Sequence, residues 1–235
     1  MLVPEKIAQV RERIAAAAAR VRRNPHDISL MAVSKTVESQ RIREAYAAGL
    51  RVFGENRVQE FEKKAAALAD LKDAEWHLIG HLQSNKARKA SEMFHGVDSV
   101  DSLHIAQKLN ESARQMGKTL PVLIEIKVSD EASKSGIPVS SPELETLLQA
   151  AATLDHIQVC GLMTVPPYTE DPEGARLFFR LLRDRRDQIA ARRLPRIQMD
   201  VLSMGMSHDF EVAIEEGSTC VRVGTAIFGQ RPKPA

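Results

Sequence analysis

Short apolar runs alternate with segments of helical period along the whole sequence, and this alternation restricts the possible folds most strongly. Each run is followed by a polar or glycine-containing turn and then by a segment whose apolar residues recur every three or four positions. About eight such units occur, which predicts a (β/α)8 barrel of the α/β class. A doubly wound open sheet is the alternative, but no G-x-G-x-x-G turn follows the first run, which favours the barrel. The predicted strands are 28–33, 51–54, 76–80, 97–100, 121–128, 157–163, 198–204 and 219–223.

The segment before the first predicted strand has the pattern of an amphipathic helix. Pro4 occupies a helix-start position, and apolar residues such as Ile7 and Val10 recur at three- or four-residue spacing. We expect this helix to span 4–23 and to end at Asn24-Pro25, because proline restricts the residue before it. No linker divides the remainder, so the sequence predicts a single barrel domain over 1–235 with an extra N-terminal helix.

A second predicted helix, over 173–191, is rich in arginine. Its arginines alternate with the apolar residues Leu177, Phe178, Leu181, Leu182 and Ile189. This alternation predicts one solvated face and one buried face, and favours this arrangement over a helix that binds nucleic acid.

Charge and apolar content exclude several classes of partner. The net charge is +2 and opposite charges are interleaved, so no tract is available to follow a nucleic-acid backbone. No apolar run approaches the roughly 18 residues that span a bilayer, and the N-terminus lacks a signal-type apolar region, so we expect a cytoplasmic protein. The seven histidines show no ligand spacing with a matching third group, and no metal site is predicted. Cys160 and Cys220 lie in apolar runs and are expected to be reduced core residues.

Polar residues follow several of the predicted strands, where a barrel builds its active site. The carboxyl ends of all barrel strands meet on one face, so residues distant in sequence become neighbours there. Lys35 follows the first strand, in the stretch AVSKT. Asn56 follows the second and His81 the third. Taken alone, a lysine in a loop is most often only solvated, so its importance depends on independent features elsewhere on the same face.

The two last strands supply such a feature. SMGMSHD places Gly205 and Ser207 ahead of a helix, and RVGTAIFG places Gly224 and Thr225 at the neighbouring strand end. Backbone N–H groups and hydroxyls of this kind bind anions, and the loops after strands seven and eight are the usual phosphate site of a barrel. A lysine on one wall and a phosphate site on another describe a phosphorylated aldehyde held by an imine. Pyridoxal phosphate and an aldolase-type sugar phosphate both satisfy this description.

Seven motifs, in order along nearly the whole chain, resemble the YggS/PROSC family of pyridoxal phosphate homeostasis proteins. The motifs are AVSKT, FGENRVQE, WHLIGHLQSNK, SVDS, GLMT, LSMGMSHDF and VRVGTAIFG. The resemblance implies a barrel of the alanine racemase type, fold type III among pyridoxal phosphate proteins. It also implies pyridoxal 5'-phosphate as the cofactor.

The resemblance assigns roles to residues at the matching positions. It implies that Lys35 carries the cofactor as an aldimine, and that Ser207, Gly224 and Thr225 bind the phosphate. Arg222 then corresponds to the racemase arginine that faces the pyridine nitrogen; its permanent charge discourages protonation of that nitrogen and weakens the ring as an electron sink. Asn56 and Met204 are expected to line the pocket beside the ring.

We expect a carrier of the cofactor rather than an enzyme. Racemases of this type add a second domain whose tyrosine acts as a base, whereas this sequence stops soon after the barrel, and neither Tyr46 nor Tyr168 lies at an obvious replacement position. The expectation is therefore a monomer with no catalytic residue, which holds pyridoxal phosphate and passes it to apo enzymes. A racemase-type enzyme is the alternative. Lys86 and Lys89, near LQSNK, could hold phosphate transiently, although a solvated helix start explains them better.

Overall fold

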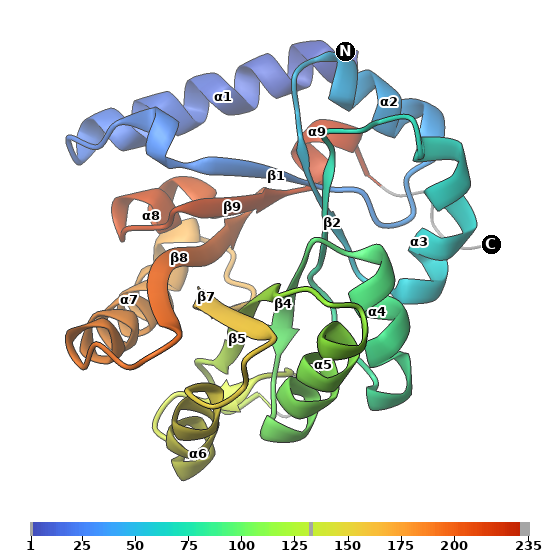
Figure 1. Cartoon of the computed structure of the whole chain (residues 1–235). Helices are drawn as coiled ribbons and strands as arrows, with labels where there is room; N and C mark the ends of the chain where they lie inside the picture. The colour runs from blue at the N-terminus through green and yellow to red at the C-terminus, as the bar shows by residue number, and fades with distance from the viewer. Residues whose placement is uncertain (1, 132–133, 231–235) are drawn as a thin grey trace.

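The computed structural model describes residues 2–131 and 134–230. In this part of the chain eight parallel strands close into a barrel, and helices cover its outer face (Figure 1). The strands follow the order β1, β2, β3, β4, β5, β7, β8, β9, and β9 pairs with β1. The predicted barrel is confirmed. Its strands are β1 (Ser29–Val33), β2 (Val52–Glu55), β3 (Glu75–Leu78), β4 (Gly96–Val100), β5 (Leu120–Lys127), β7 (Ile157–Met163), β8 (Ile197–Met206) and β9 (Cys220–Val223).

Helices connect the strands wherever the sequence has a segment of helical period. The α-helices after the first strand are α2 (Ser39–Ala47), α3 (Val58–Ala65), α4 (Ala87–Met93), α5 (Leu103–Gln115), α6 (Pro142–Ala151), α7 (Arg176–Ala191), α8 (Phe210–Glu215) and α9 (Thr225–Phe228). Single 3-10 turns occur at η1 (Pro25–Asp27), η2 (Ala66–Leu68), η3 (Ser84–Lys86) and η4 (Pro172–Ala175). The N-terminus of α6 is capped by Ser141, whose hydroxyl accepts a hydrogen bond from the Glu143 N–H at 3.0 Å.

The N-terminal helix α1 (Val3–Arg20) precedes the barrel, as predicted, and packs against α2, α8 and α9 (Figure 1). It buries Ile7, Val10 and Ile14 on one face, which is the face that the periodicity indicated. The helix ends at Arg20 rather than at residue 23, because Arg22 adopts a positive φ of 57° and turns the chain before Asn24-Pro25.

Several strand bounds differ from the prediction by one or two residues; β3, for example, ends at Leu78 and not at residue 80. β6 (Ile137–Pro138) adds to the end of β5, and two residues are too few to give an apolar run. β8 continues to Met206, beyond the predicted end at Met204, and its pairing with β9 shifts register between Ser203 and Met206. The longer strand changes which methionine reaches the barrel mouth.

The arginine-rich helix α7 has the two faces that were expected, but the buried face is narrower. Phe179, Leu182 and Ile189 are buried. Leu177 and Leu181 were expected on the buried face and are instead exposed, with 72% and 40% of their surface accessible. Both leucines lie on the side of the helix that turns away from the row 179, 182 and 189.

An aromatic cluster packs α3 and α4 onto the outside of the barrel. The Phe53 ring of β2 stacks on Trp76 of β3 with ring centroids 4.9 Å apart. Phe61 of α3 lies 4.7 Å from Trp76 and 5.0 Å from Phe94, again between ring centroids. The contact of Phe61 with Trp76 fixes α3 against β3.

Gly161 allows β7 and β8 to approach closely. A Cβ atom added there would lie 1.8 Å from the Val201 carbonyl oxygen, and backbone cannot yield as a flexible side chain can. We expect Gly161→Ala to lower the free energy of unfolding by at least about 3 kcal/mol in urea denaturation. Gly117→Ala is the matched control, because Gly117 has φ +64° but no atom within 4 Å of its added Cβ, so only about 1 kcal/mol should be lost. An equal loss of unfolding free energy in Gly161→Ala and Gly117→Ala would contradict the expected clash with Val201.

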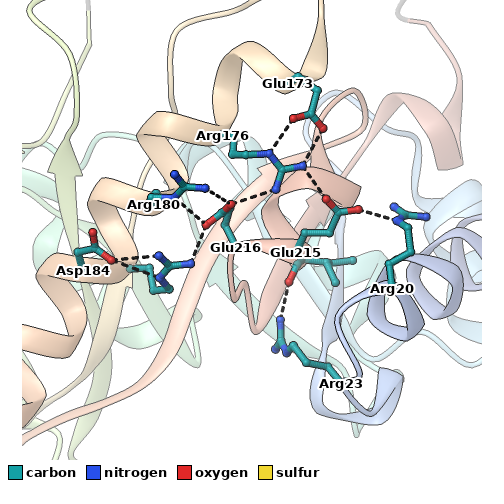
Figure 2. A network of polar contacts seen from close by, with 10 residues as sticks. Arg20, Arg23, Glu173, Arg176, Arg180, Asp184, Glu215 and Glu216 are labelled. Carbon is teal, nitrogen blue, oxygen red and sulfur yellow. Dashed lines mark hydrogen bonds and ion pairs between the residues drawn. The ribbon is translucent and has the colours of Figure 1, made fainter.

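Charged side chains fasten α1 and α7 to the end of α8 (Figure 2). Glu216, at the end of α8, forms ion pairs with Arg176, Arg180 and Arg183 at 3.0, 3.1 and 2.6 Å. The arginines of α7 are therefore not simply solvated. Glu215 pairs at 2.6 Å with both Arg176 and Arg20, and Arg20 belongs to α1.

Candidate functional site

A cavity of about 610 Å³ lies at the carboxyl ends of the barrel strands. Its size is in the usual range for pockets that bind small molecules. Loops that follow β1, β2, β3, β8 and β9 contribute to its wall, together with side chains on β5 and β9. The lining residues used below are Val33, Lys35, Thr36, Asn56, Gly80, His81, Glu125, Met206, Ser207, Arg222, Gly224 and Thr225.

Lys35 reaches the cavity because side chains alternate along β1 and its continuation. Val33 and Lys35 both line the cavity, whereas Ser34 between them is fully buried on the other side. The Ser34 hydroxyl donates to Glu55 Oε1 at 2.5 Å, which fixes the side to which Ser34 points. Lys35 is half-buried in a turn that begins at the strand end.

Asn56 lies beside this wall, after β2, and lines the cavity as predicted. Its backbone is held close to the loop after β3, because a Cβ atom on Gly80 would lie 2.4 Å from the Asn56 carbonyl oxygen. Any other residue at position 80 would force the two loops apart.

The loop after β8 presents Ser207 to the cavity. Gly205 has φ +93°, and an added Cβ there would lie 2.5 Å from Ala213 Cβ, so glycine is required for this turn. Asp209 closes the turn by accepting a hydrogen bond from the Met206 N–H at 2.6 Å. The Ser207 Oγ accepts hydrogen bonds from the N–H groups of Gly224 and Ala226, at 3.3 and 3.2 Å. The serine hydroxyl still has its own proton to donate.

Gly224 and Thr225 bring the loop after β9 to the same part of the cavity. A Cβ on Gly224 would lie 3.3 Å from both the carbonyl oxygen and the Cβ of Val33, so the small residue lets this loop lie against β1. The hydroxyls of Ser207 and of the exposed Thr225 are uncharged hydrogen-bond donors in these two loops, and the Gly224 and Ala226 N–H groups orient the Ser207 hydroxyl by donating to its oxygen.

Arg222 places a buried guanidinium in the cavity wall, at 3% exposure. Its Nη1 donates to Ser203 Oγ and its Nη2 to the Thr164 carbonyl oxygen, each at 2.7 Å. Burial lowers the pKa of Arg222, and acidic groups that include Glu125 oppose this effect. The two hydrogen bonds fix the orientation of the guanidinium.

The sequence prediction missed Glu125, a buried carboxyl group in the cavity wall. It is the one acid in the apolar run LPVLIEIKV, and this isolation was the signal that could have revealed it. His81, on the same wall, has Nδ1 2.7 Å from Asp101 Oδ2. Burial raises the pKa of Glu125 to about 7; Asp101 adds to the effect, while Arg222 and His81 oppose it.

Glu125 should make stability depend on pH. A glutamate with its ordinary pKa of 4.5 ionises in the unfolded chain well before Glu125 ionises in the folded protein. Its contribution is therefore fully present below pH 4.5 and is lost as the pH rises toward 7. Relative to Glu125→Gln, wild-type unfolding free energy should fall by up to about 3 kcal/mol over this range, measured by urea denaturation at several pH values. A difference independent of pH would contradict the assignment.

Six of the seven residues predicted for the site line the cavity: Lys35, Asn56, Ser207, Arg222, Gly224 and Thr225. The seventh does not. Met204 is fully buried in the hydrophobic core, and Met206 takes its place in the wall. Ser203 bonds to Arg222 in the cavity wall, so the next residue, Met204, faces the opposite side of β8 and enters the hydrophobic core.

No group of three or more His, Cys, Asp or Glu residues is arranged to hold a metal ion in the part of the chain that the structure describes. Both cysteines are free thiols. Cys220 is buried as expected, while Cys160 is only partly buried. Lys86 and Lys89 lie apart from the main cavity, in a separate groove of about 400 Å³ between α3 and α4.

Comparisons with known proteins identify the family. The profile of the family described as alanine racemase, N-terminal domain, matches residues 6–232. A pyridoxal phosphate homeostasis protein from Aquifex aeolicus (strain VF5) is 46% identical over 228 residues, which cover 97% of each chain. The protein of the same name from Escherichia coli (strain K12) is 44% identical over 231 residues, again 97% of each. This chain belongs to the pyridoxal phosphate homeostasis protein family. The resemblance carried by the seven motifs is thereby confirmed.

Solved structures agree with this membership. PipY of Synechococcus elongatus PCC7942, solved with pyridoxal phosphate bound, matches with a TM-score of 0.85 and 37% identity. The match covers 97% of this chain and 100% of PipY. Alanine racemase from Corynebacterium glutamicum matches with a TM-score of 0.72 at 21% identity, over 97% of this chain and 62% of the racemase. At that identity the racemase shows the shared barrel fold alone.

Proposed function

We propose that this chain binds pyridoxal 5'-phosphate reversibly through the amine of Lys35 and takes part in homeostasis of that cofactor. The observation that carries the proposal is the arrangement of one cavity, with Lys35 in one wall and the donors around Ser207 and Gly224 in another. Pyridoxal phosphate supplies an aldehyde that condenses with an amine, a phosphate, and a ring that accepts electrons. Relatives that match over nearly their full length carry the homeostasis name, which supports the same role here.

The residues around Ser207 fit a phosphate group. The N–H groups of Gly224 and Ala226 donate to the Ser207 oxygen and so leave the Ser207 proton for a phosphate oxygen, and the Thr225 hydroxyl lies in the neighbouring loop. In the proposal these groups hold the phosphate and thereby keep the aldehyde end of the cofactor within reach of Lys35.

Arg222 would limit the chemistry of the ring, although the matching arginine of the racemases means that it does not by itself separate a carrier from a racemase. A guanidinium stays charged, so a ring nitrogen that faces it is discouraged from taking a proton. A ring without that proton withdraws electrons from a bound amino acid less strongly. The hydrogen bonds to Ser203 and Thr164 hold the guanidinium in place, so it cannot swing away to relieve this effect.

The finer features of the role are also proposals. We propose a monomeric protein of the cytoplasm that delivers pyridoxal phosphate to apo forms of enzymes that use it. In the described part of the chain, no helix has the length and apolar character to cross a bilayer. The cavity mouth has the exposed residues Thr36 and Glu38 at its edge, which leaves a route for the cofactor to leave.

Borohydride trapping tests the binding role. Purified protein is mixed with pyridoxal phosphate, its visible absorbance is recorded, and the lysine-bound adduct is reduced and located by peptide mass spectrometry. We expect an absorbance band that an added amine removes, and an adduct mass of pyridoxal phosphate on the peptide that contains Lys35. Absence of the band, or an adduct spread over surface lysines, would overturn the proposal. A sugar phosphate on Lys35 of freshly purified protein would instead indicate an aldolase.

Solvent-deuterium exchange tests the carrier role. A panel of amino acids is incubated in deuterated buffer with loaded protein or with free pyridoxal phosphate at equal concentration. We expect exchange at the α-carbon no faster with the protein than with the free cofactor. Faster exchange that disappears in Lys35→Ala would show an enzyme instead.

A further inference from the structure

The turn that carries Lys35 is held from the outer side of the barrel wall, away from the cavity. Lys64 Nζ, on α3, donates to the Ser34 carbonyl oxygen at 2.8 Å. Glu60, one helical turn earlier on α3, accepts a hydrogen bond from the Thr36 N–H. The backbone on both sides of Lys35 is therefore bonded to side chains of the same helix.

Glu55 completes this arrangement from β2. Its Oε1 accepts the Ser34 hydroxyl at 2.5 Å and pairs with Lys64 Nζ at 2.8 Å. Lys64 also lies 3.6 Å from Glu60, as residues four apart on a helix do. We call Glu55, Glu60 and Lys64 the clamp.

The clamp lies between the barrel and α3. Gly54 points inward, because its added Cβ would meet the side chains of Met31 and Ile79. Since side chains alternate along a strand, Glu55 points outward, toward the helix that contains Lys64. The clamp therefore touches the backbone of the Lys35 turn from behind and supplies no side chain to the phosphate end of the cavity.

Burial of these charges is costly for folding. Glu55 is 0% exposed and the Lys64 side chain only 11%. Glu55 Oε2 has no hydrogen-bond partner among the described residues. Burial raises the pKa of Glu55, and Lys64 opposes that effect. Buried ion pairs of this kind are often no more stabilising than apolar residues of similar volume, so stability alone does not account for the clamp.

The held turn is also strained. Thr36 has φ +61°, a left-handed conformation that costs a β-branched residue more than glycine. Such a conformation persists only where surrounding contacts impose it, and such sites cluster where geometry serves function. Here the contacts are two hydrogen bonds: the Thr36 N–H donates to Glu60, and Lys64 donates to the Ser34 carbonyl oxygen.

We propose that Glu55, Glu60 and Lys64 are positioning residues, which fix the turn around Lys35 so that its amine is pre-oriented toward the cavity. This inference rests on the proposed function, because it assumes that Lys35 is the point of attachment. A loosened turn leaves the amine spread over many orientations, of which few face the bound aldehyde. Loss of the clamp should therefore weaken covalent binding while the phosphate donors stay intact.

Three variants separate positioning from folding. Lys64→Met removes the donor to Ser34 but leaves Glu55 buried without its partner. Glu55→Gln/Lys64→Met removes both charges and so avoids an unpaired buried carboxylate. Glu60→Ala removes the acceptor of the Thr36 N–H, and it perturbs the fold least because position 60 is partly exposed. Lys63→Met is the matched control, since Lys63 is the neighbouring exposed lysine on α3.

Two readouts are needed, one with and one without the cofactor. The first is the dissociation constant for pyridoxal phosphate, from titration of the visible absorbance band. We expect it to rise at least tenfold in the double variant and at least threefold in Glu60→Ala, with no change in Lys63→Met. The second is amide hydrogen exchange of the peptide containing residues 34–37 in cofactor-free protein. We expect at least tenfold faster exchange there in the double variant, with the peptides of β8 and β9 unchanged.

The outcomes distinguish the two proposals. A wild-type protein that forms no absorbance band contradicts the proposed function. A wild-type protein that forms the band, together with a folded double variant and Glu60→Ala that bind with wild-type affinity, overturns the positioning role alone. If the double variant does not fold, Glu60→Ala decides: unchanged affinity and unchanged exchange at 34–37 reject the proposal.

Discussion

Lys35→Ala is expected to abolish the visible absorbance band that forms when pyridoxal phosphate is added. Lys35 lines the cavity at the end of β1, and its amine is the group in the proposal that forms the covalent bond. The phosphate donors around Ser207 remain, so weak noncovalent binding should persist, at least about a hundredfold weaker than in wild type, or roughly 2.7 kcal/mol. Equilibrium dialysis measures this residual binding, because it does not depend on the absorbance band.

The variant should remain folded, because truncation of a half-buried side chain in a turn usually changes stability by less than about 1 kcal/mol. Lys72→Ala is the control, as Lys72 is exposed and lies away from the cavity. It should keep the band and the affinity. A band that survives in Lys35→Ala would move the attachment to another lysine, and reduction with borohydride would then locate it.

The order of the strands and most of the site follow from local features of the sequence. Most strands are short apolar runs that end in a polar or glycine-containing turn. Lys35, Asn56 and Gly224 could therefore be placed at strand ends from the sequence alone. The geometry of a closed barrel then brings these ends together, whatever their separation in sequence. Only the assumption of the fold was needed to join them.

Features that depend on the exact length of a strand, or on contacts between residues far apart in the sequence, could not be predicted. Met204 was placed at the cavity because β8 was expected to end there, and the register shift against β9 extends the strand by two residues. Glu125 could have been suspected from its isolation in an apolar run, but its raised pKa could not be predicted, since that arises from burial and from Asp101, which follows a different strand. The clamp residues come from two elements, β2 and α3, and contact the turn after β1; only the spacing of Glu60 and Lys64 is visible in the sequence.

The arginines of α7 illustrate the same limit. Their number predicts a charged face, but not which acids they meet. In the structure Arg176, Arg180 and Arg183 converge on the end of α8, the helix that follows the loop of Ser207 (Figure 2), whereas Arg185 pairs with Glu145 of α6. The network therefore fixes the far end of the helix whose preceding loop contributes to the cavity.

Glu216→Gln is expected to destabilise the fold strongly. The Glu216 side chain is only 5% exposed and pairs with Arg176, Arg180 and Arg183. The glutamine amide keeps the shape of the side chain but loses its negative charge. Three guanidinium groups then lie together without the carboxylate that they shared. Hydrogen bonds to charged groups contribute roughly 1.5–3 kcal/mol. The three arginines are 25%, 49% and 31% exposed, so water compensates part of the loss, and urea denaturation at neutral pH should show a decrease of about 2 kcal/mol.

Glu211→Gln is the matched control on the same helix, because Glu211 forms a single, more exposed pair with Arg13. Such a pair contributes less than about 1 kcal/mol. The effect of Glu216 should also depend on pH: burial would raise its pKa, but hydrogen bonds from Arg180 and Arg176 outweigh this and lower it below 4.5. Its contribution is thus present above pH 4.5 and is lost as the pH falls through the lowered pKa, so wild type and Glu216→Gln should converge in acid. Equal losses in Glu216→Gln and Glu211→Gln at neutral pH would show that the network holds α7 and α8 no more firmly than an ordinary surface pair.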